Sequence, residues 1–138
     1  LRQGPIANLT RREGLSANAT TALLEDRQGI LWVGTWGSGL NRIGPEGVEV
    51  IGSKEGMQGH FVTGLHEDAD GTLWFGTWHG GLHRLRDGHL ARLTPGNLQE
   101  TDSIWALTRG GDGRLWVGTS RGLFAVDGER RMIASGFS

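Results

Sequence analysis

Leu31-Trp32-Val33-Gly34-Thr35 is the stretch that decides the fold, because the chain repeats it twice. Residues 73–77 read Leu-Trp-Phe-Gly-Thr and residues 115–119 read Leu-Trp-Val-Gly-Thr, so both intervals are 42 residues. A glycine stands two residues ahead of each copy. A fixed period of this length with strand-like content indicates a repeat protein in which each unit is one small set of strands.

The composition favours short strands joined by tight turns. Of 138 residues, 25 are glycine and six are tryptophan, without the triplet period of collagen. The formal net charge is −1 and the basic residues are scattered, which argues against a nucleic-acid partner. There is no cysteine, so no disulfide framework is expected. No apolar run reaches the length of a membrane span, so we expect no membrane contact by this segment itself.

The period divides the chain into three units within a single β-propeller segment covering residues 1–138. The units are residues 6–47, 48–89 and 90–131, with partial units at residues 1–5 and 132–138. The chain begins without Met in the middle of a unit. We therefore expect it to be an excised or processed piece of a longer chain.

Each unit contains four short segments with strand composition, bounded by turn residues. The first type has one polar face, as in an outer strand, and the second is small and apolar, as in a buried strand. First-type segments lie at residues 6–10, 48–52, 90–94 and 132–135. Second-type segments lie at residues 20–24, 61–65 and 104–108. The third type is the repeated motif, and fourth-type segments lie at residues 39–43, 81–85 and 122–126.

Four antiparallel strands per 42 residues, with no helix pattern anywhere, predict an all-β chain built from blades of a β-propeller. Residues 20–24, 30–36, 39–43 and 48–52 are expected to form one sheet, with the second segment innermost. The motif strand carries bulk on both faces, so sheets are expected to pack on both sides of it, with Trp as core and Gly as a point of close approach. These structural residues are Trp32, Gly34, Trp74, Gly76, Trp116 and Gly118.

The full motif points to a known family. Residues 23–42 follow the pattern Leu-x-Glu-Asp-x-x-Gly-x-Leu-Trp-Val-Gly-Thr-x-x-x-Gly-Leu-x-Arg, which resembles the two-component regulator propeller repeat. Residues 65–84 fit as well, with Phe in place of Val. Residues 107–125 lack the acidic turn and the final Arg. The resemblance covers essentially the whole chain.

The resemblance implies the periplasmic or extracytoplasmic sensing portion of a membrane-anchored bacterial protein. The output modules in that family are histidine kinases, hybrid two-component sensors or diguanylate cyclases, and nothing in this sequence resembles one. The family motif is structural, so it carries no catalytic residue here. The expected function is therefore non-catalytic sensing, without a cofactor.

Loops at one end of the channel are where a propeller is expected to bind a ligand. An aromatic side chain there offers a flat apolar platform and an indole donor, suited to a sugar ring or another planar small molecule. The candidate ligand-binding residues are Trp36, Trp78, His79, Arg121, His60 and Asp102. Ser120, Met57 and Asn97 lie on the same loops. The competing interpretation of the two tryptophans is packing over the neighbouring blade, because they recur in register.

Metal binding is not expected. The run Asp68-Ala69-Asp70-Gly71 looks like the start of a calcium loop, but the other two units lose the pattern and no bidentate Glu follows at the required spacing. His79 and His83 are four residues apart on a hairpin, where this spacing does not make a helical metal pair.

Two other functions remain open from the residues. One is a scaffold that docks another protein, and the other is a fragment of a propeller lyase similar to the streptogramin type. Whatever the function, three blades are too few to close a propeller ring. Because an open array would expose large apolar faces, we expect self-association, with a homodimer completing a six-bladed ring.

Overall fold

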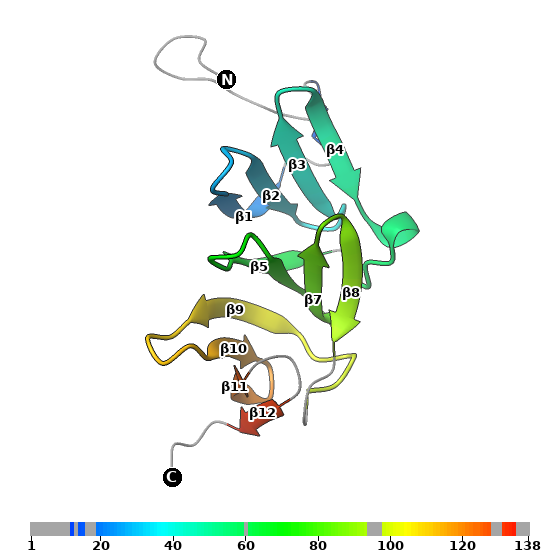
Figure 1. The fold of residues 1–138 in the computed structure, drawn as a ribbon. Helices are drawn as coiled ribbons and strands as arrows, with labels where there is room; N and C mark the ends of the chain where they lie inside the picture. The colour runs from blue at the N-terminus through cyan, green and yellow to red at the C-terminus, as the bar shows by residue number, and fades with distance from the viewer. Residues whose placement is uncertain are drawn as a thin grey trace.

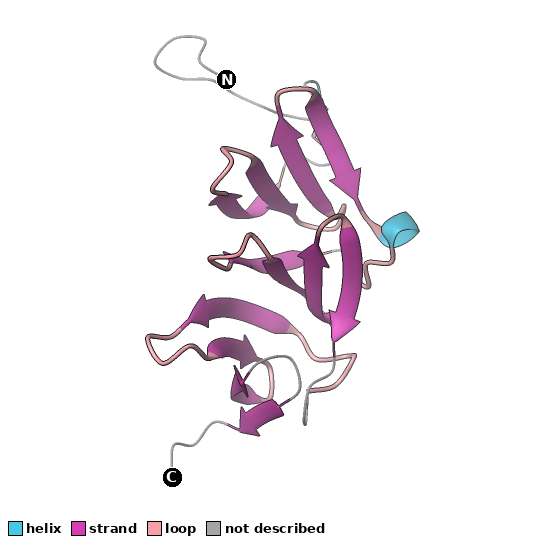
Figure 2. Cartoon of the chain, viewed as in Figure 1, coloured by secondary structure: helices cyan, strands magenta, loops and turns pink. Residues whose placement is uncertain are grey.

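The structure, a computed structural model, describes residues 12, 14–15, 19–59, 61–93, 98–127 and 131–134. Within these ranges it consists of strands, turns and a 3₁₀ turn, η2 (Ser53–Glu55), with no α-helix (Figure 2). The all-β prediction is therefore confirmed. In the same part of the chain, no helix is long and apolar enough to cross a membrane.

The strands form three four-stranded antiparallel sheets, each paired in simple up-and-down order (Figure 1). Blade 1 contains β1 (Thr20–Glu25), β2 (Leu31–Thr35), β3 (Leu40–Gly44) and β4 (Gly47–Ile51). Blade 2 contains β5 (Val62–Glu67), β6 (Leu73–Thr77), β7 (Gly81–Arg86) and β8 (His89–Leu93). Blade 3 contains β9 (Ile104–Arg109), β10 (Leu115–Thr119), β11 (Gly122–Asp127) and β12 (Arg131–Ala134). The predicted four-strand pairing is confirmed in all three.

The blades follow one another along the array, from blade 1 at the top of the view to blade 3 at the bottom (Figure 1). The first strands of the blades are neighbours, since β5 contacts both β1 and β9. Strand β12, which lies mostly in the partial unit at residues 132–138, pairs with β11 and completes blade 3. The first-type segment at residues 6–10 lies outside the described residues.

The hairpins that open each blade share one turn. In blade 2 the Asp68 amide donates to the Thr72 carbonyl at 2.8 Å, and the Gly71 amide donates to the Asp68 carbonyl at 2.9 Å. Gly71 has a φ of 89°, which only glycine adopts without strain. Blades 1 and 3 repeat both backbone bonds 42 residues away, at Asp26 and Gly110. The turn therefore sets the register between the first two strands of every blade.

The motif tryptophans point toward the following blade. Trp32 belongs to a core cluster with Leu73 and Phe75 of blade 2, and Trp74 belongs to one with Leu115 of blade 3. Trp32 and Trp74 are 7% and 2% exposed, as predicted. Trp116, also expected to be largely buried, is of intermediate exposure and less buried than the other two. The physical reason is that within the described residues no sheet covers that face of blade 3.

The motif glycines allow the next blade to approach. A Cβ on Gly34 would lie 2.8 Å from Val62 Cγ1, and a Cβ on Gly76 would lie 2.1 Å from Ile104 Cβ. The same two inner-strand residues accept a hydrogen bond from the preceding blade at their carbonyls: Thr21 Oγ1 donates to Val62 and Thr63 Oγ1 donates to Ile104. Blades 2 and 3 thus each pack a first-strand residue, Val62 or Ile104, directly against the motif glycine of the preceding blade.

The connections between blades add one apolar side chain to each interface. Met57 is 1% exposed within the core cluster between blades 1 and 2. Leu98 is 3% exposed within the cluster between blades 2 and 3. Leu15 precedes blade 1 in the same way, and it packs with Val33 and Ile43 on the opposite face of that sheet.

Substituting alanine for Gly76 is expected to destabilise the fold by about 1–3 kcal/mol, because the new methyl group would overlap Ile104. Urea unfolding followed by circular dichroism measures the change. Gly52→Ala is the matched control, since a Cβ there meets nothing within 4 Å. Equal losses of unfolding free energy in the two variants would contradict the close packing of Ile104 against Gly76.

Candidate functional site

A row of aromatic side chains lies at the end of the motif strands of blades 1 and 2. Trp36 and Trp78 directly follow β2 and β6, and Phe61 directly precedes β5. The Trp78 amide donates to the Phe61 carbonyl at 2.9 Å, while an isolated antiparallel bridge joins Trp36 to Phe61. These backbone contacts therefore bring aromatic residues of blades 1 and 2 side by side.

The rings of this row are in contact with one another. The ring centroids of Trp36 and Phe61 are 4.4 Å apart, and those of Phe61 and Trp78 are 5.3 Å apart with an interplanar angle of 27°. His79 extends the row, with its centroid 4.3 Å from that of Trp78. We call Trp36, Phe61, Trp78 and His79 the aromatic row.

The aromatic row is open to solvent. Trp36 is 56% exposed and Trp78 is 42% exposed, while His79 is exposed and Phe61 is half-buried. The two tryptophans thus pack on Phe61 and still present a large surface. The rings therefore contact the neighbouring blade, as the packing interpretation expects, without being covered by it.

Phe61 is the member of the row that the sequence did not reveal. It directly precedes Val62 and was assigned to the buried inner strand at residues 61–65. In the structure β5 begins one residue later, and Phe61 lies beneath the turn of blade 1. Gly37 in that turn has a φ of 104°, and a Cβ there would lie 3.1 Å from Phe61 Cε1. The positive-φ glycine permits this close approach.

Blade 3 does not continue the row. Ser120 and Ser103 occupy the positions of Trp78 and Phe61, and the Ser120 amide donates to the Ser103 carbonyl at 3.1 Å. The Ser103 hydroxyl accepts from the His79 amide at 2.8 Å. Serine at these positions therefore ends the aromatic surface and fixes His79, which has a φ of 62°.

Two further predicted ligand residues, Asp102 and Arg121, bind each other. Arg121 Nε lies 2.7 Å from Asp102 Oδ1, and Arg121 Nη2 lies 2.8 Å from Asp102 Oδ2. The Gln99 amide also donates to Asp102 Oδ2, at 2.8 Å. The hydrogen bonds from Arg121 lower the pKa of Asp102, although burial opposes the shift. The pair holds the connection into blade 3 against the β10–β11 turn.

The other predicted loop residues have different outcomes. Met57 is buried in the core between blades 1 and 2, so it packs rather than faces a ligand. His60 and Asn97 lie outside the described residues. The structure therefore brings together Trp36, Trp78 and His79 in one group, and Asp102 and Arg121 in another.

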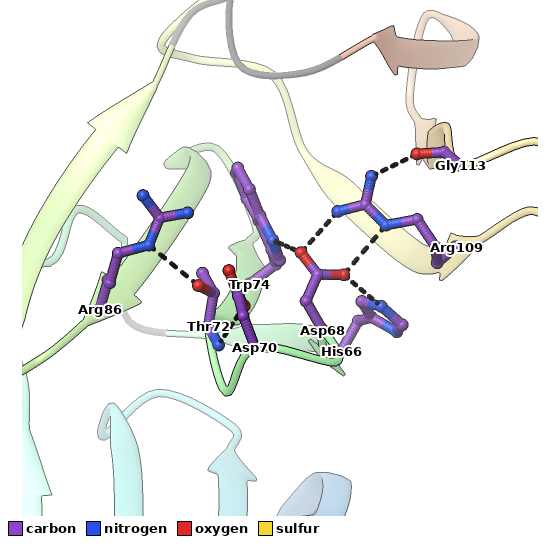
Figure 3. Close-up of polar contacts among 8 residues, drawn as sticks. All are labelled: His66, Asp68, Asp70, Thr72, Trp74, Arg86, Arg109 and Gly113. Atoms are coloured by element: carbon purple, nitrogen blue, oxygen red, sulfur yellow. Dashed lines mark hydrogen bonds and ion pairs between the residues drawn. The ribbon is translucent and has the colours of Figure 1, made fainter.

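The acidic turn of the motif binds the motif tryptophan. Asp68 Oδ2 accepts from Trp74 Nε1 at 2.7 Å (Figure 3). Asp26 Oδ2 likewise accepts from Trp32 Nε1 at 3.0 Å. This contact, which these aspartates make in addition to their bonds within the turn, was not predicted from the sequence. Their regular spacing of six residues from a tryptophan was the signal for this second contact. In blade 3 Gly110 stands in place of the aspartate.

Asp68 also joins blade 2 to blade 3. Arg109 of β9 approaches it with two nitrogens, Nε at 3.0 Å and Nη2 at 2.5 Å, and His66 Nε2 lies 3.0 Å from Oδ1 (Figure 3). Burial raises the pKa of Asp68, but the bonds from Arg109, Trp74 and His66 outweigh it and lower the pKa. A carboxylate engaged in this way is a poor calcium ligand.

A groove of about 640 Å³ opens between blades 1 and 2 at the other end of the strands. Its lining includes the carboxylates of Asp26, Glu49, Glu55, Glu67, Asp70 and Asp87. Several already accept hydrogen bonds within the fold, as Glu67 does from the Arg27 amide and Asp70 from the Thr72 amide. In the described part of the chain no group of three or more His, Cys, Asp or Glu side chains is placed to hold a metal ion. The groove therefore offers less to a ligand than the aromatic row.

His83 is a neutral histidine in the core. It is fully buried, stacks on Phe75 with centroids 4.8 Å apart, and accepts from the Gln58 amide through Nε2 at 3.0 Å. Its Nδ1 atom has no hydrogen-bond partner among the described residues. Burial lowers the pKa of His83 to about 4. His79 and His83 thus lie in different environments, one exposed and one buried.

The sequence matches the family described as two component regulator propeller at residues 14–37, 56–79 and 98–121, just over half of the chain. No curated protein sequence matches it.

Solved structures with a similar fold include two extracellular domains from B. thetaiotaomicron, assigned to hybrid two-component systems. That of BT4673 is 25% identical, with a TM-score of 0.78 over 96% of this chain and 18% of that chain. That of BT3049 is 19% identical, with a TM-score of 0.78 over 94% of this chain and 18% of that chain. The chain therefore spans less than a fifth of either domain.

A structure of a catalytically inactive virginiamycin B lyase from Staphylococcus aureus, with quinupristin, is also similar. It is 15% identical, with a TM-score of 0.60 over 83% of this chain and 40% of that chain. This likeness concerns the fold alone.

Trp74→Ala is expected to lower the free energy of unfolding by about 3–5 kcal/mol, because it empties a buried site and removes the indole bonded to Asp68. Trp78→Ala removes a half-exposed ring and should cost less than about 1.5 kcal/mol. Urea unfolding of the two variants gives both values. Comparable losses would show that Trp78 is a core residue.

The free energy of unfolding is expected to fall as the pH drops from 6.5 to 4. The unfolded chain protonates His83 near its ordinary pKa of 6.5, whereas the folded chain resists protonation until about pH 4. The loss is on the order of 3 kcal/mol. The lowered pKa of Asp68 does not affect the free energy of unfolding in this pH range, because that carboxyl would lose its stabilising effect only as the pH falls below its ordinary pKa of 3.8.

Urea unfolding at pH 7 and at pH 4.5 measures the effect. His83→Gln should flatten the dependence, while His89→Gln, at an exposed position, should leave it unchanged. An unchanged slope in His83→Gln would contradict a neutral core imidazole.

Proposed function

Because this chain belongs to the two-component regulator propeller family, we propose that it is a non-catalytic, ligand-sensing segment of a bacterial signal-transduction receptor. The structural likeness to the BT4673 extracellular domain supports this assignment. The chain would supply signal input, and the output would come from another part of a longer protein. Its place would be periplasmic or otherwise extracytoplasmic, as it is for the extracellular domains that it resembles.

We assign ligand contact to the aromatic row, and the exposure of Trp36 and Trp78 is the observation that carries this assignment. Large exposed aromatic faces are uncommon on a protein surface unless they serve a contact. Here the rings are held by stacking on Phe61, so a ligand would meet a preformed platform. The ligand class is a small molecule or glycan with a flat apolar face, and indole N–H groups are available at the edges.

The blade interfaces and Asp102 with Arg121 would support this site rather than contact the ligand. The guanidinium and the carboxylate satisfy each other in a two-point contact. His79 lies at the end of the row and is exposed, so it can offer a ring nitrogen to a polar group of the ligand. A protein-docking scaffold would use the same exposed rings without binding a small ligand.

The test is a screen of glycans and planar small molecules against the purified chain, followed by tryptophan fluorescence and calorimetry. With the best ligand, Trp36→Ala and Trp78→Ala should each weaken binding at least about tenfold, as expected for a stacking residue at the centre of a contact.

Trp105→Ala is the matched control, since Trp105 is 48% exposed but lies outside the aromatic row. Its affinity should stay within about twofold of the parent chain. If ligands bind and the Trp36 and Trp78 variants bind them equally well, the aromatic row is not the site. If no ligand binds but another protein does, the scaffold function replaces sensing.

A further inference from the structure

The two interfaces between the blades carry different charges at one equivalent place, where the β1–β2, β5–β6 and β9–β10 turns project to the same side of the array (Figure 1). In the second interface Asp68 of blade 2 binds Arg109, the last residue of β9. The residues 42 positions earlier, in the first interface, are Asp26 and Glu67. An acidic residue therefore stands in the first interface where a basic residue stands in the second.

The second interface shows how the turn aspartate holds a cation. The Arg109 guanidinium donates through Nε and Nη2 to the two oxygens of Asp68, and through Nη1 to the Gly113 carbonyl at 2.7 Å (Figure 3). A guanidinium matches a carboxylate in this two-point geometry. The turn aspartate and the turn carbonyl of the following blade thus form a guanidinium site, which the chain fills with its own side chain.

The first interface has the same acceptors without a cation from the protein. Asp26 and Gly71 are the counterparts of Asp68 and Gly113. Glu67 replaces the arginine, and its carboxylate accepts at 3.1 Å from the backbone amide of the residue that follows Asp26. Among the described residues no Arg, Lys or His side chain forms an ion pair with Asp26 or Glu67. Two half-buried carboxylates therefore lie beside each other with no positive group between them.

Both carboxylates can accept further hydrogen bonds. Asp26 Oδ1 accepts from two backbone amides at 2.9 Å, whereas Oδ2 accepts from the Trp32 indole alone. The two oxygens of Glu67 share one amide, at 3.1 and 3.4 Å. A carboxylate oxygen has two acceptor sites, so Asp26 Oδ2 and both oxygens of Glu67 have room for another donor. A bound cation would also relieve the repulsion between the two charges.

These carboxylates line the groove of about 640 Å³ between blades 1 and 2. The lining holds six carboxylates against one guanidinium, that of Arg42. It also includes the apolar side chains of Ile51, Leu73, Leu85 and Leu90. A volume of this size is typical of a site for a small molecule. The groove therefore suits a small organic cation that carries its charge on an apolar stem.

The packing of one blade on the next does not require this negative charge. The second interface has Ala91 and Arg109 at the positions of Glu49 and Glu67. It nevertheless forms an apolar core like that of the first interface. Local charge that the same fold does without is expected at a functional site rather than at a structural one.

We propose that the groove between blades 1 and 2 binds a small guanidinium compound, with the guanidinium held by Asp26 and Glu67 as Arg109 is held by Asp68. The Gly71 carbonyl would accept from the same group, as the Gly113 carbonyl does from Arg109. A carboxylate on the ligand would face the acidic lining, so the class excludes free amino acids. This inference does not rest on the aromatic row, which lies at the other end of the strands.

The test is calorimetric titration of the 138-residue chain with 4-guanidinobutylamine at an ionic strength of about 0.15 M. A single molecule should bind per chain, with a Kd of about 1 mM or tighter. Two related probes should bind at least about tenfold more weakly. Butane-1,4-diamine lacks the guanidinium, and arginine adds a carboxylate.

Glu67→Arg is the most informative variant, because it copies the second interface into the first. Its own guanidinium should occupy the site on Asp26 and weaken binding of the probe at least about 30-fold. Glu67→Gln removes the charge without filling the site and should weaken binding about tenfold. Glu46→Gln is the matched control, since Glu46 is an exposed carboxylate that lines a neighbouring hollow but not the groove. It should bind the probe like the parent chain.

Circular dichroism of the three variants checks that the blades are folded. No binding to the parent chain at about 10 mM probe would overturn the proposal. Equal weakening by Glu46→Gln and Glu67→Gln would indicate general charge attraction and overturn it as well. Unchanged binding in Glu67→Arg would place the ligand elsewhere on the chain, and equal affinity for the diamine would exclude guanidinium recognition. Tighter binding of calcium than of the probe would identify a metal site instead.

Discussion

The close approach of a β-branched side chain to a strand glycine is the contact on which the rest of the structure depends. Val62 above Gly34 and Ile104 above Gly76 bring consecutive sheets near enough for the threonine hydroxyls to reach carbonyls of the next blade. The motif tryptophans fill the wider part of the same interface. A larger residue at the glycine would separate the sheets and remove these contacts together, because interiors are close-packed.

The motif aspartate gives the tryptophan an orientation as well as a place. An indole N–H buried without an acceptor carries a desolvation cost, and the carboxylates of Asp26 and Asp68 remove it. The same carboxylate of Asp68 then receives Arg109 from the next blade, so a single turn residue connects a hairpin, a core ring and an interface. The acidic turn is therefore part of the packing and not merely a loop signal.

Periodicity predicted the strands well, because burial recurs with the repeat and each copy of the motif confirms the others. It predicted the positions of Trp36 and Trp78 for the same reason. Contacts between repeats were harder, since Arg109 and Asp68 are 41 residues apart and Arg109 replaces a glutamate of the earlier copies. Phe61 continues an apolar run and gave no sign of leaving the strand. Asp102 and Arg121 looked available for a ligand because their mutual contact depends on three-dimensional proximity.

The offset between sequence repeat and sheet has a consequence for how such arrays evolve. Residues 48–51 begin a new repeat in the sequence, yet they lie in β4, the last strand of the preceding sheet. A duplicated 42-residue unit therefore supplies the last strand of the preceding sheet and the first three strands of the next sheet. Recombination can lengthen the array at any repeat boundary, because each inserted repeat is joined to the preceding repeat by the backbone hydrogen bonds of a complete strand pair. This offset between repeat and sheet makes the array tolerant of changes in the number of repeats and resistant to the separation of neighbouring repeats.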